Sequence, residues 1–212
     1  MAQICITGAS RGIGLGFTRA YLAAGNRVFA AARNPAAETL SALHAEYPDT
    51  LTPVKMDVSD RASVDRGAAE IAEHGDSLDI LVNNAGIAKK PDEQRIEDIN
   101  EVDISEVFNV NTLGPLRVTQ ALFPLLRKSR YAKVVMISSS AGSIASQGGG
   151  RGVPYCVSKA GLNMLTKLLY FHCKEEGIAT VAVHPGWVRT DMGGAGALSV
   201  DESVEHMMQL IA

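Results

Sequence analysis

Short apolar runs alternate with amphipathic stretches along the whole chain. Runs rich in β-branched residues predict six strands, at residues 3–7, 27–31, 52–57, 80–83, 133–138 and 180–184. Several of these runs are apolar almost without interruption, which is typical of parallel strands covered on both faces. Because helical periodicity follows each strand, the pattern predicts successive β-α units.

Start and stop signals place the helices between these strands. We expect helices over residues 12–24, 35–46, from 59 onward, from 103 to about 126, and over 155–177. Asn34, Ser59 and Asp103 are the predicted entry residues, and Glu106 completes a capping-box spacing with Asp103. Proline within the fourth helix, at Pro115 and Pro124, should bend it.

This order of elements predicts an α/β fold, a single Rossmann-type doubly wound parallel sheet with helices on both faces. No repeat or linker divides residues 1–212, so we expect one dinucleotide-binding and catalytic domain. Such sheets bind ligands at the carboxyl ends of their strands. The glycine-rich stretches 140–152 and 193–196 fall there and are expected to be loops of a site.

Composition and charge argue against several classes of function, among them binding of nucleic acid and insertion into a membrane. The 212 residues are 46% apolar and 20% charged, with a net charge of −3, so the chain can build a core and has no diffuse basic character for nucleic acid. No apolar run reaches the roughly 18 residues that span a bilayer. Three cysteines without a CxxC spacing favour a reducing cytoplasm, and five scattered histidines favour no metal site.

The first predicted βα turn has the pattern of a nucleotide-binding turn. It reads Thr7-Gly8-Ala9-Ser10-Arg11-Gly12-Ile13-Gly14, directly after a strand and at the start of a helix. Glycines there let backbone N–H groups approach a pyrophosphate at the positive end of the helix dipole. A tight turn with a glycine-packed helix is the other interpretation, and the position favours the dinucleotide.

The end of the second strand discriminates between NAD and NADP. The residues are Ala30-Ala31-Ala32-Arg33, without the acid that holds the ribose 2′-hydroxyl of NAD. Arg33 and Arg11 offer two guanidinium groups to the 2′-phosphate of NADP. The alternatives are that both arginines are merely solvated, or that Glu38 serves NAD.

Tyr155 and Lys159 lie four positions apart at the predicted start of a helix. This spacing puts the ammonium one turn from a phenol whose ordinary pKa is about 10. The charge should lower the phenol pKa toward values useful for proton transfer at neutral pH. Alone, such a pair is common by chance and usually exposed.

Taken together, the motifs resemble the short-chain dehydrogenase/reductase family over essentially the whole chain. In order, they are Thr7-Gly8-x3-Gly12-x-Gly14, Asp57-Val58, Asn83-Asn84-Ala85-Gly86, Asn111-Thr112-Leu113-Gly114, Ser138-Ser139-x-x-Gly142, Tyr155-x3-Lys159 and His184-Pro185-Gly186. Within that family, residues 111–119 and 184–194 are similar to sniffer-type carbonyl reductases and C-factor-like proteins.

The resemblance implies a catalytic tetrad. Tyr155 would be the general acid, and Lys159 would lower its pKa and hold the nicotinamide ribose. Ser139 would polarise the substrate oxygen, with Ser138 or Ser140 as substitutes in the same run of serines. Asn111 would hold a water that links Lys159 to solvent.

The resemblance also implies a set of cofactor contacts. Asp57 would hold the adenine amino group, Asn83 and Gly86 would line the adenosine and ribose side, and Thr190 with the backbone of 186–188 would hold the carboxamide. The expected cofactor-binding residues are Gly8, Ser10, Arg11, Gly12, Ile13, Gly14, Arg33, Asp57, Val58, Asn83, Ala85, Gly86, Tyr155, Lys159, Pro185, Gly186, Val188 and Thr190.

The sequence departs from the family at two places. Residues 146–152 lengthen the segment between Ser139 and Tyr155, and the chain stops at Ala212, where the family continues into a further strand. The chain is therefore either naturally short or truncated; truncation would leave the sixth strand as an unprotected edge. A homodimer or homotetramer is compatible with the resemblance.

The leading hypothesis is an NADPH-dependent reductase of a small or medium apolar aldehyde or ketone. The pocket would be shaped by Leu113, Ile144, Val153, Trp187 and Met192, each of which could equally belong to the core. The alternative is a non-catalytic NADP(H)-binding regulatory or signalling protein of the C-factor type. Glycine-rich loops fix neither the substrate nor the direction of the reaction.

Overall fold

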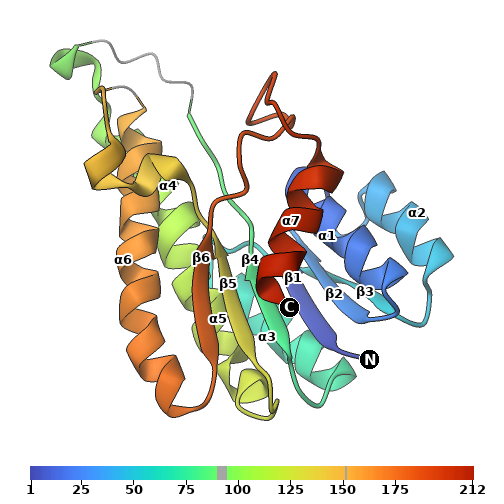
Figure 1. The fold of residues 1–212 in the computed structure, drawn as a ribbon. Helices are drawn as coiled ribbons and strands as arrows, with labels where there is room; N and C mark the ends of the chain where they lie inside the picture. Colours follow the sequence, from blue (N-terminus) through green and yellow to red (C-terminus); the bar gives the residue numbers. More distant parts are fainter. Residues whose placement is uncertain (90–94, 151) are drawn as a thin grey trace.

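The computed structural model describes residues 1–89, 95–150 and 152–212; Arg151, in the lengthened loop, lies outside them. Six parallel strands form one sheet in the order β3-β2-β1-β4-β5-β6 (Figure 1). The strands are β1 (Gln3–Thr7), β2 (Arg27–Ala32), β3 (Leu51–Lys55), β4 (Ile80–Asn83), β5 (Lys133–Ile137) and β6 (Ala179–Val183). The predicted doubly wound sheet is confirmed.

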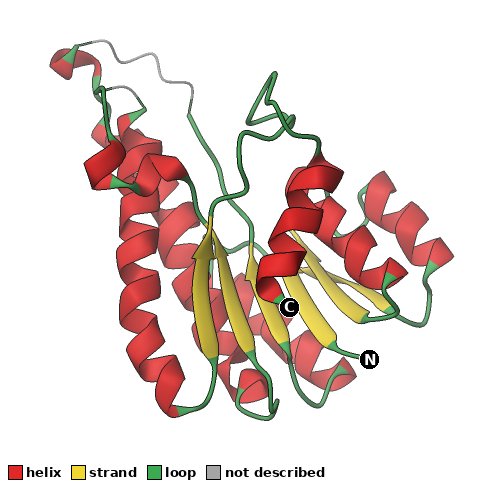
Figure 2. Ribbon diagram, viewed as in Figure 1, coloured by secondary structure: helices red, strands yellow, loops and turns green. Residues whose placement is uncertain are grey.

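Helices cover both faces of this sheet (Figure 2). They are α1 (Gly12–Ala23), α2 (Glu38–Glu46), α3 (Arg61–His74), α4 (Glu101–Phe108), α5 (Gly114–Leu126), α6 (Val153–Glu175) and α7 (Val200–Ile211). Alternate strand residues face opposite layers, so Ile4 and Ile6 pack with α1, α2 and α7, whereas Cys5 packs with α3, α5 and α6.

Four strand ends and the starts of four helices differ from the predictions. Asp57, Ser138 and His184, predicted within strands, lie in the loops just beyond them, and β2 continues to Ala32. The second helix begins at Glu38 rather than Pro35, because Asn34 accepts the N–H of Ala36 in a preceding turn. The α6 helix begins two residues before Tyr155, at Val153.

Neighbouring acceptors explain the other shifts. Asp60, not Ser59, caps α3 by accepting the N–H of Ala62, since Ser59 is hydrogen-bonded to Asp57. Asn100, not Asp103, caps α4. The predicted capping box of Asp103 and Glu106 is therefore wrong; both carboxylates pair with Lys89 instead.

The fourth predicted helix is not regular. A π-helical turn, Asn109–Leu113, lies between α4 and α5 and ends two residues before Pro115. Pro124 lies inside α5 without ending it. Such π turns are rare and occur often at functional sites.

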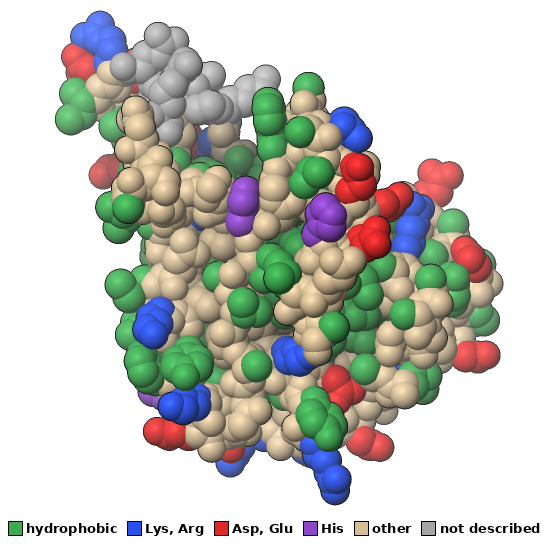
Figure 3. Space-filling model, in the orientation of Figure 1, with side chains coloured by type: hydrophobic (Ala, Val, Ile, Leu, Met, Phe, Trp, Pro, Cys, Tyr) green, Lys and Arg blue, Asp and Glu red, His purple; other side chains and the backbone are tan. Residues whose placement is uncertain are grey.

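The visible face of the molecule carries charges of both signs (Figure 3). On the face shown in Figure 3, basic side chains are scattered among acidic and polar ones. Within the described ranges, no helix is long and apolar enough to cross a membrane. The fold instead places its chemistry at the carboxyl ends of the strands, where doubly wound sheets bind ligands.

Candidate active site

The predicted site residues converge on one edge of the sheet. Gly8–Gly14 follows β1, Asp57 follows β3, Asn84–Gly86 follows β4 and Ser139 follows β5. His184–Val188 follows β6, and α6 brings Tyr155 and Lys159. Segments separated by up to 180 residues therefore meet at this edge.

The glycine-rich turn is interlocked with the segment after β4. Gly14 packs so tightly that a Cβ there would collide with the Gly8 carbonyl and lie 2.5 Å from Asn84 Nδ2. Gly8 has φ +68°, a conformation that favours glycine. Thr7 Oγ1 accepts the backbone N–H groups of Asn84 and Ala85, each at 3.0 Å.

The start of α1 is suited to a phosphate. Arg11 occupies the N-cap position without capping the helix through its side chain, and the first turn holds no acidic residue. Its N–H groups and the helix dipole thus meet no competing anion from this turn. Thr190 faces the same turn, since a Cβ on Gly12 would lie 3.5 Å from Thr190 Cγ2.

The two arginines predicted to bind a 2′-phosphate have different surroundings. Arg11 is not merely solvated: its Nη1 lies 2.7 Å from Asp191 Oδ2, although both side chains are largely exposed. Arg33 is exposed at the end of β2. Burial acts to raise the pKa of Asp57, but hydrogen bonds from Ser59 and the charge of Arg33 together hold that pKa below its usual value.

Asn83 and Asn84 have different surroundings. Asn83 is only 2% exposed and its side chain donates to Thr119 Oγ1, so its contact with the adenosine side would come from its backbone. Asn84 holds the glycine-rich turn by donating to the Thr7 carbonyl at 2.9 Å. The motif pointed to this segment but assigned no role to Asn84.

Tyr155 and Lys159 lie one turn apart on α6, as predicted. Lys159 is 5% exposed, donates to the Ile137 carbonyl at 2.7 Å, and holds Nζ 5.6 Å from the Tyr155 ring centroid. Burial lowers the pKa of Lys159 to about 8.

The pKa of Tyr155 shifts opposite to the prediction. Burial of the phenol raises it, and a hydrogen bond with Ser139 only partly opposes the rise. The expected net lowering of the phenol pKa is therefore wrong in this structure, because desolvation raises that pKa more than the Ser139 hydrogen bond lowers it.

The three serines after β5 have separate environments. Ser138 is buried and donates to Asn163 Oδ1 at 2.6 Å. Ser140 is exposed, and its backbone N–H donates to His184 Nδ1. Since Ser139 is the one hydrogen-bonded to Tyr155, the geometry favours it as the catalytic serine.

Asn111 is fully buried in the π turn. Its Oδ1 accepts the Ile87 N–H, while Nδ2 donates to the Ile87 carbonyl and to Ser158 Oγ. Both amide hydrogens are thereby used. The Asn111 main-chain carbonyl lacks the α-helical donor four residues on, because that residue is Pro115.

The expected substrate side is apolar and open. Ile144 is 84% exposed, Trp187 63% and Met192 51%, so these three are not core residues. Leu113 and Val153 are half-buried. Trp187 is held by its Nε1, which donates to the Gly193 carbonyl at 2.8 Å.

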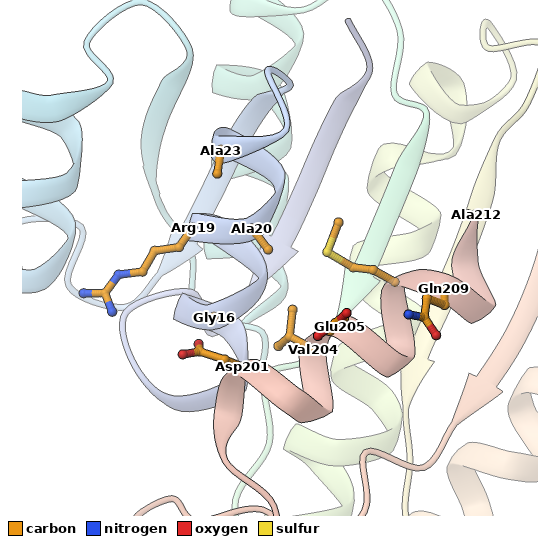
Figure 4. Close-up of a pocket in the computed structure, with 10 residues that line it drawn as sticks. Gly16, Arg19, Ala20, Ala23, Asp201, Val204, Glu205, Gln209 and Ala212 are labelled. Atoms are coloured by element: carbon orange, nitrogen blue, oxygen red, sulfur yellow. The ribbon is translucent and has the colours of Figure 1, made fainter.

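A separate groove of about 570 Å³ lies between α1 and α7 (Figure 4). It is lined by Gly16, Arg19, Ala20, Ala23, Asp201, Val204, Glu205, Met208, Gln209 and Ala212. None of these belongs to the tetrad or to the turn Gly8–Gly14. The described residues contain no cluster of His, Cys, Asp and Glu that could hold a metal ion.

Comparison with known proteins identifies the family. The family model for short chain dehydrogenases matches residues 2–197. The chain belongs to the short-chain dehydrogenase family. A curated relative of this dehydrogenase is the C-signal of Myxococcus xanthus, 40% identical over 135 residues, which are 63% of this chain and 80% of the relative.

Solved structures agree with this assignment. An NADPH-bound carbonyl reductase from chicken fatty liver is 39% identical, with a TM-score of 0.92 over 100% of this chain and 91% of that one. The carbonyl reductase Sniffer of D. melanogaster is 32% identical, with a TM-score of 0.94 over the same shares. This dehydrogenase is an oxidoreductase by family, and its particular reaction is considered next.

Proposed function

We propose that this short-chain dehydrogenase is an NADPH-dependent carbonyl reductase acting on small or medium apolar aldehydes or ketones. The observation that carries the proposal is the Tyr155 phenol, hydrogen-bonded to Ser139 and backed by the Lys159 ammonium at 5.6 Å from its ring. An acid beside a second hydroxyl is an arrangement that can bind and protonate a carbonyl oxygen. The similar reductases from chicken and fly support it.

The cofactor site fits a dinucleotide with a 2′-phosphate. The turn Gly8–Gly14 would hold the pyrophosphate, Asp57 the adenine, and Thr190 with the 186–188 backbone the carboxamide. Arg33 and Arg11 would hold the 2′-phosphate, for which Arg11 must share or exchange Asp191. NADPH, when bound, supplies the hydride.

Three side chains of the site would carry out the proton transfer. Because burial raises the pKa of Tyr155, the phenol stays protonated at neutral pH and can give its proton to the substrate oxygen. Ser139 Oγ polarises that oxygen. The Lys159 ammonium, charged below a pKa of about 8, stabilises the phenolate that remains.

Reprotonation would pass through Lys159 toward Asn111. Both amide hydrogens of Asn111 are engaged, and we assign the relay water to its main-chain carbonyl. Pro115 favours this route, since it cannot supply the usual helical donor to that carbonyl. The exposed rim of Ile144, Trp187 and Met192 favours apolar substrates.

The C-signal relative favours one alternative, an NADP(H)-binding signalling protein without turnover. Such a binder does not require a positioned phenol, so the tetrad argues for the enzyme. We further propose that residues 1–212 act as one catalytic domain in the cytoplasm, as a homodimer or homotetramer; Cys5 and Cys173 are buried free thiols.

The test is the initial rate of NADPH oxidation with a panel of dicarbonyls, aldehydes and ketones. Tyr155→Phe should lose about 100-fold or more in kcat while keeping NADPH affinity. Tyr131→Phe, on an 80% exposed tyrosine, is the matched control. Absence of turnover in the wild type, with NADPH still raising the melting temperature, would instead support the signalling alternative.

A further inference from the structure

Arg117 on α5 is a half-buried cation bound mainly by backbone and amide oxygens. Its Nη1 donates to the carbonyls of Val58 and Asn109, each at 3.2 Å, and its Nη2 donates to Asn109 Oδ1 at 2.6 Å. No carboxylate pairs with Arg117 within the part of the chain that the structure describes. The guanidinium therefore joins two backbone segments rather than neutralising an acid.

The first of these segments is residues 57–59, here called the adenine loop because Asp57 is the proposed adenine ligand. Asn109 Nδ2 also reaches it, donating to the Ser59 carbonyl at 3.4 Å. Packing reinforces the contact, since a Cβ on Gly114 would lie 3.0 Å from Val58 Cγ2. The adenine loop is thus attached to the π turn and to α5 by hydrogen bonds and by close packing.

The second segment is the π turn Asn109–Leu113, which also carries Asn111. Asn111 Nδ2 donates to Ser158 Oγ at 3.0 Å, and Ser158 Oγ donates to the Tyr155 carbonyl at 2.7 Å. A continuous path of hydrogen bonds and helical turn therefore runs from the adenine loop to the first turn of α6. Bonds from a charged donor are the stronger members of such a path.

We propose that Arg117 is a positioning residue that couples the adenine end of the nucleotide site to the proton route at Asn111. It holds the adenine loop and the π turn in one fixed relation. This inference rests on the proposed function, because the proton route is defined by the reductase chemistry.

The experiment compares Arg117→Met, Arg117→Lys and Arg61→Met in the full chain. Arg61 is the matched control, since it is exposed and donates to Gln120 of the same helix α5. Calorimetry with adenosine 2′,5′-bisphosphate measures the adenine end without turnover, and the pH profile of kcat reports the proton route. Arg117→Met should weaken the bisphosphate about tenfold and shift the profile by about half a pH unit or more. For both readouts, Arg117→Lys should give values between those of Arg117→Met and the wild type. Arg61→Met should give the wild-type values.

Three results would overturn the coupling. One is a lower melting temperature in Arg117→Met with unchanged affinity and an unchanged pH profile, which would indicate a purely structural role. Another is a change in only one of the two readouts. If Arg117→Met does not fold, the third is an Arg117→Lys variant whose bisphosphate affinity and pH profile of kcat both equal those of the wild type. If the wild type reduces no carbonyl, the proposed function fails, but the bisphosphate titration can still be made. Unchanged bisphosphate affinity in the Arg117 variants would then show that Arg117 does not position the adenine loop.

Discussion

The two halves of the site share one edge of the sheet but are held in different ways. In the nucleotide half, backbone packs on backbone, as where Gly14 meets Gly8. In the substrate half, Ile144 and Trp187 stand largely in solvent, and a Cβ added at Gly149 would meet nothing within 4 Å. Contacts between backbones leave little freedom in residue type, whereas exposed side chains leave the choice of substrate open.

The largest contrast should come from matched glycine substitutions. Gly14→Ala places a methyl group against the Gly8 carbonyl, so we expect NADPH affinity to fall more than about 100-fold and stability to fall by about 3 kcal/mol. Gly149→Ala should change stability by less than about 0.5 kcal/mol. Calorimetry and denaturant unfolding measure both, and equal effects of the two substitutions would remove the contrast.

Because Lys159 is buried beside Tyr155, we predict that the free energy of unfolding depends on pH. Above pH 8 the folded protein holds a neutral Lys159, while the unfolded chain keeps the proton up to about 10.5. Wild-type stability, relative to Lys159→Met, should therefore be constant below pH 8 and rise by about 3 kcal/mol between pH 8 and 10.5.

The same proton loss should act against catalysis. As the ammonium titrates, the reductase kcat should fall when the pH rises through about 8. Unfolding free energies of both proteins at several pH values, and kcat of the wild type, are the measurements. A stability difference that does not vary with pH would contradict the burial effect.

Cofactor choice should respond to a single exposed cation. We expect Arg33→Gln to lower NADPH affinity about tenfold and leave NADH affinity unchanged, because NADH has no 2′-phosphate with which this charge could pair. Arg130→Gln, at another exposed arginine, is the control. An equal loss for both nucleotides would contradict this placement of the 2′-phosphate.

The smallest effect is expected at the open rim of the substrate half. Trp187→Ala should raise KM for an apolar ketone roughly threefold to tenfold with kcat within about twofold, since a rim contact binds substrate and transition state alike. Leu210→Ala, at a 74% exposed leucine on α7, should change neither value. A large fall in kcat would show that Trp187 orders the reacting groups.

Much of the fold is predictable from sequence because β-branched runs and glycine punctuation are local signals. Helix starts are less predictable, since Ser59 and Asp60 could both cap α3 and only the bond of Ser59 to Asp57 decides between them. Likewise Asp103 has the sequence of a cap, yet Lys89 pairs with it from another segment. Such choices depend on tertiary contacts.

The site was predictable as a set of positions, less so as a set of contacts. Motifs located the serines and the Asn83–Asn84 pair, but burial determines which side chain faces the turn and which faces the core. The Arg11–Asp191 pair spans 180 residues of chain, and the π turn that orients Asn111 has no distinct periodic signal. The direction of the Tyr155 pKa shift likewise follows from desolvation, which spacing alone does not reveal.

The central claim is tested most directly by following the hydride itself. NADPH carrying deuterium at the transferred position of the nicotinamide would be mixed with the best substrate of the panel, and the alcohol analysed by mass spectrometry. One deuterium on the carbinol carbon is expected with the wild type and with Tyr131→Phe, and about 100-fold slower product formation with Tyr155→Phe. NADPH binding without any labelled alcohol, or equal rates for Tyr155→Phe and the wild type, would contradict a carbonyl reductase that uses Tyr155 as its acid.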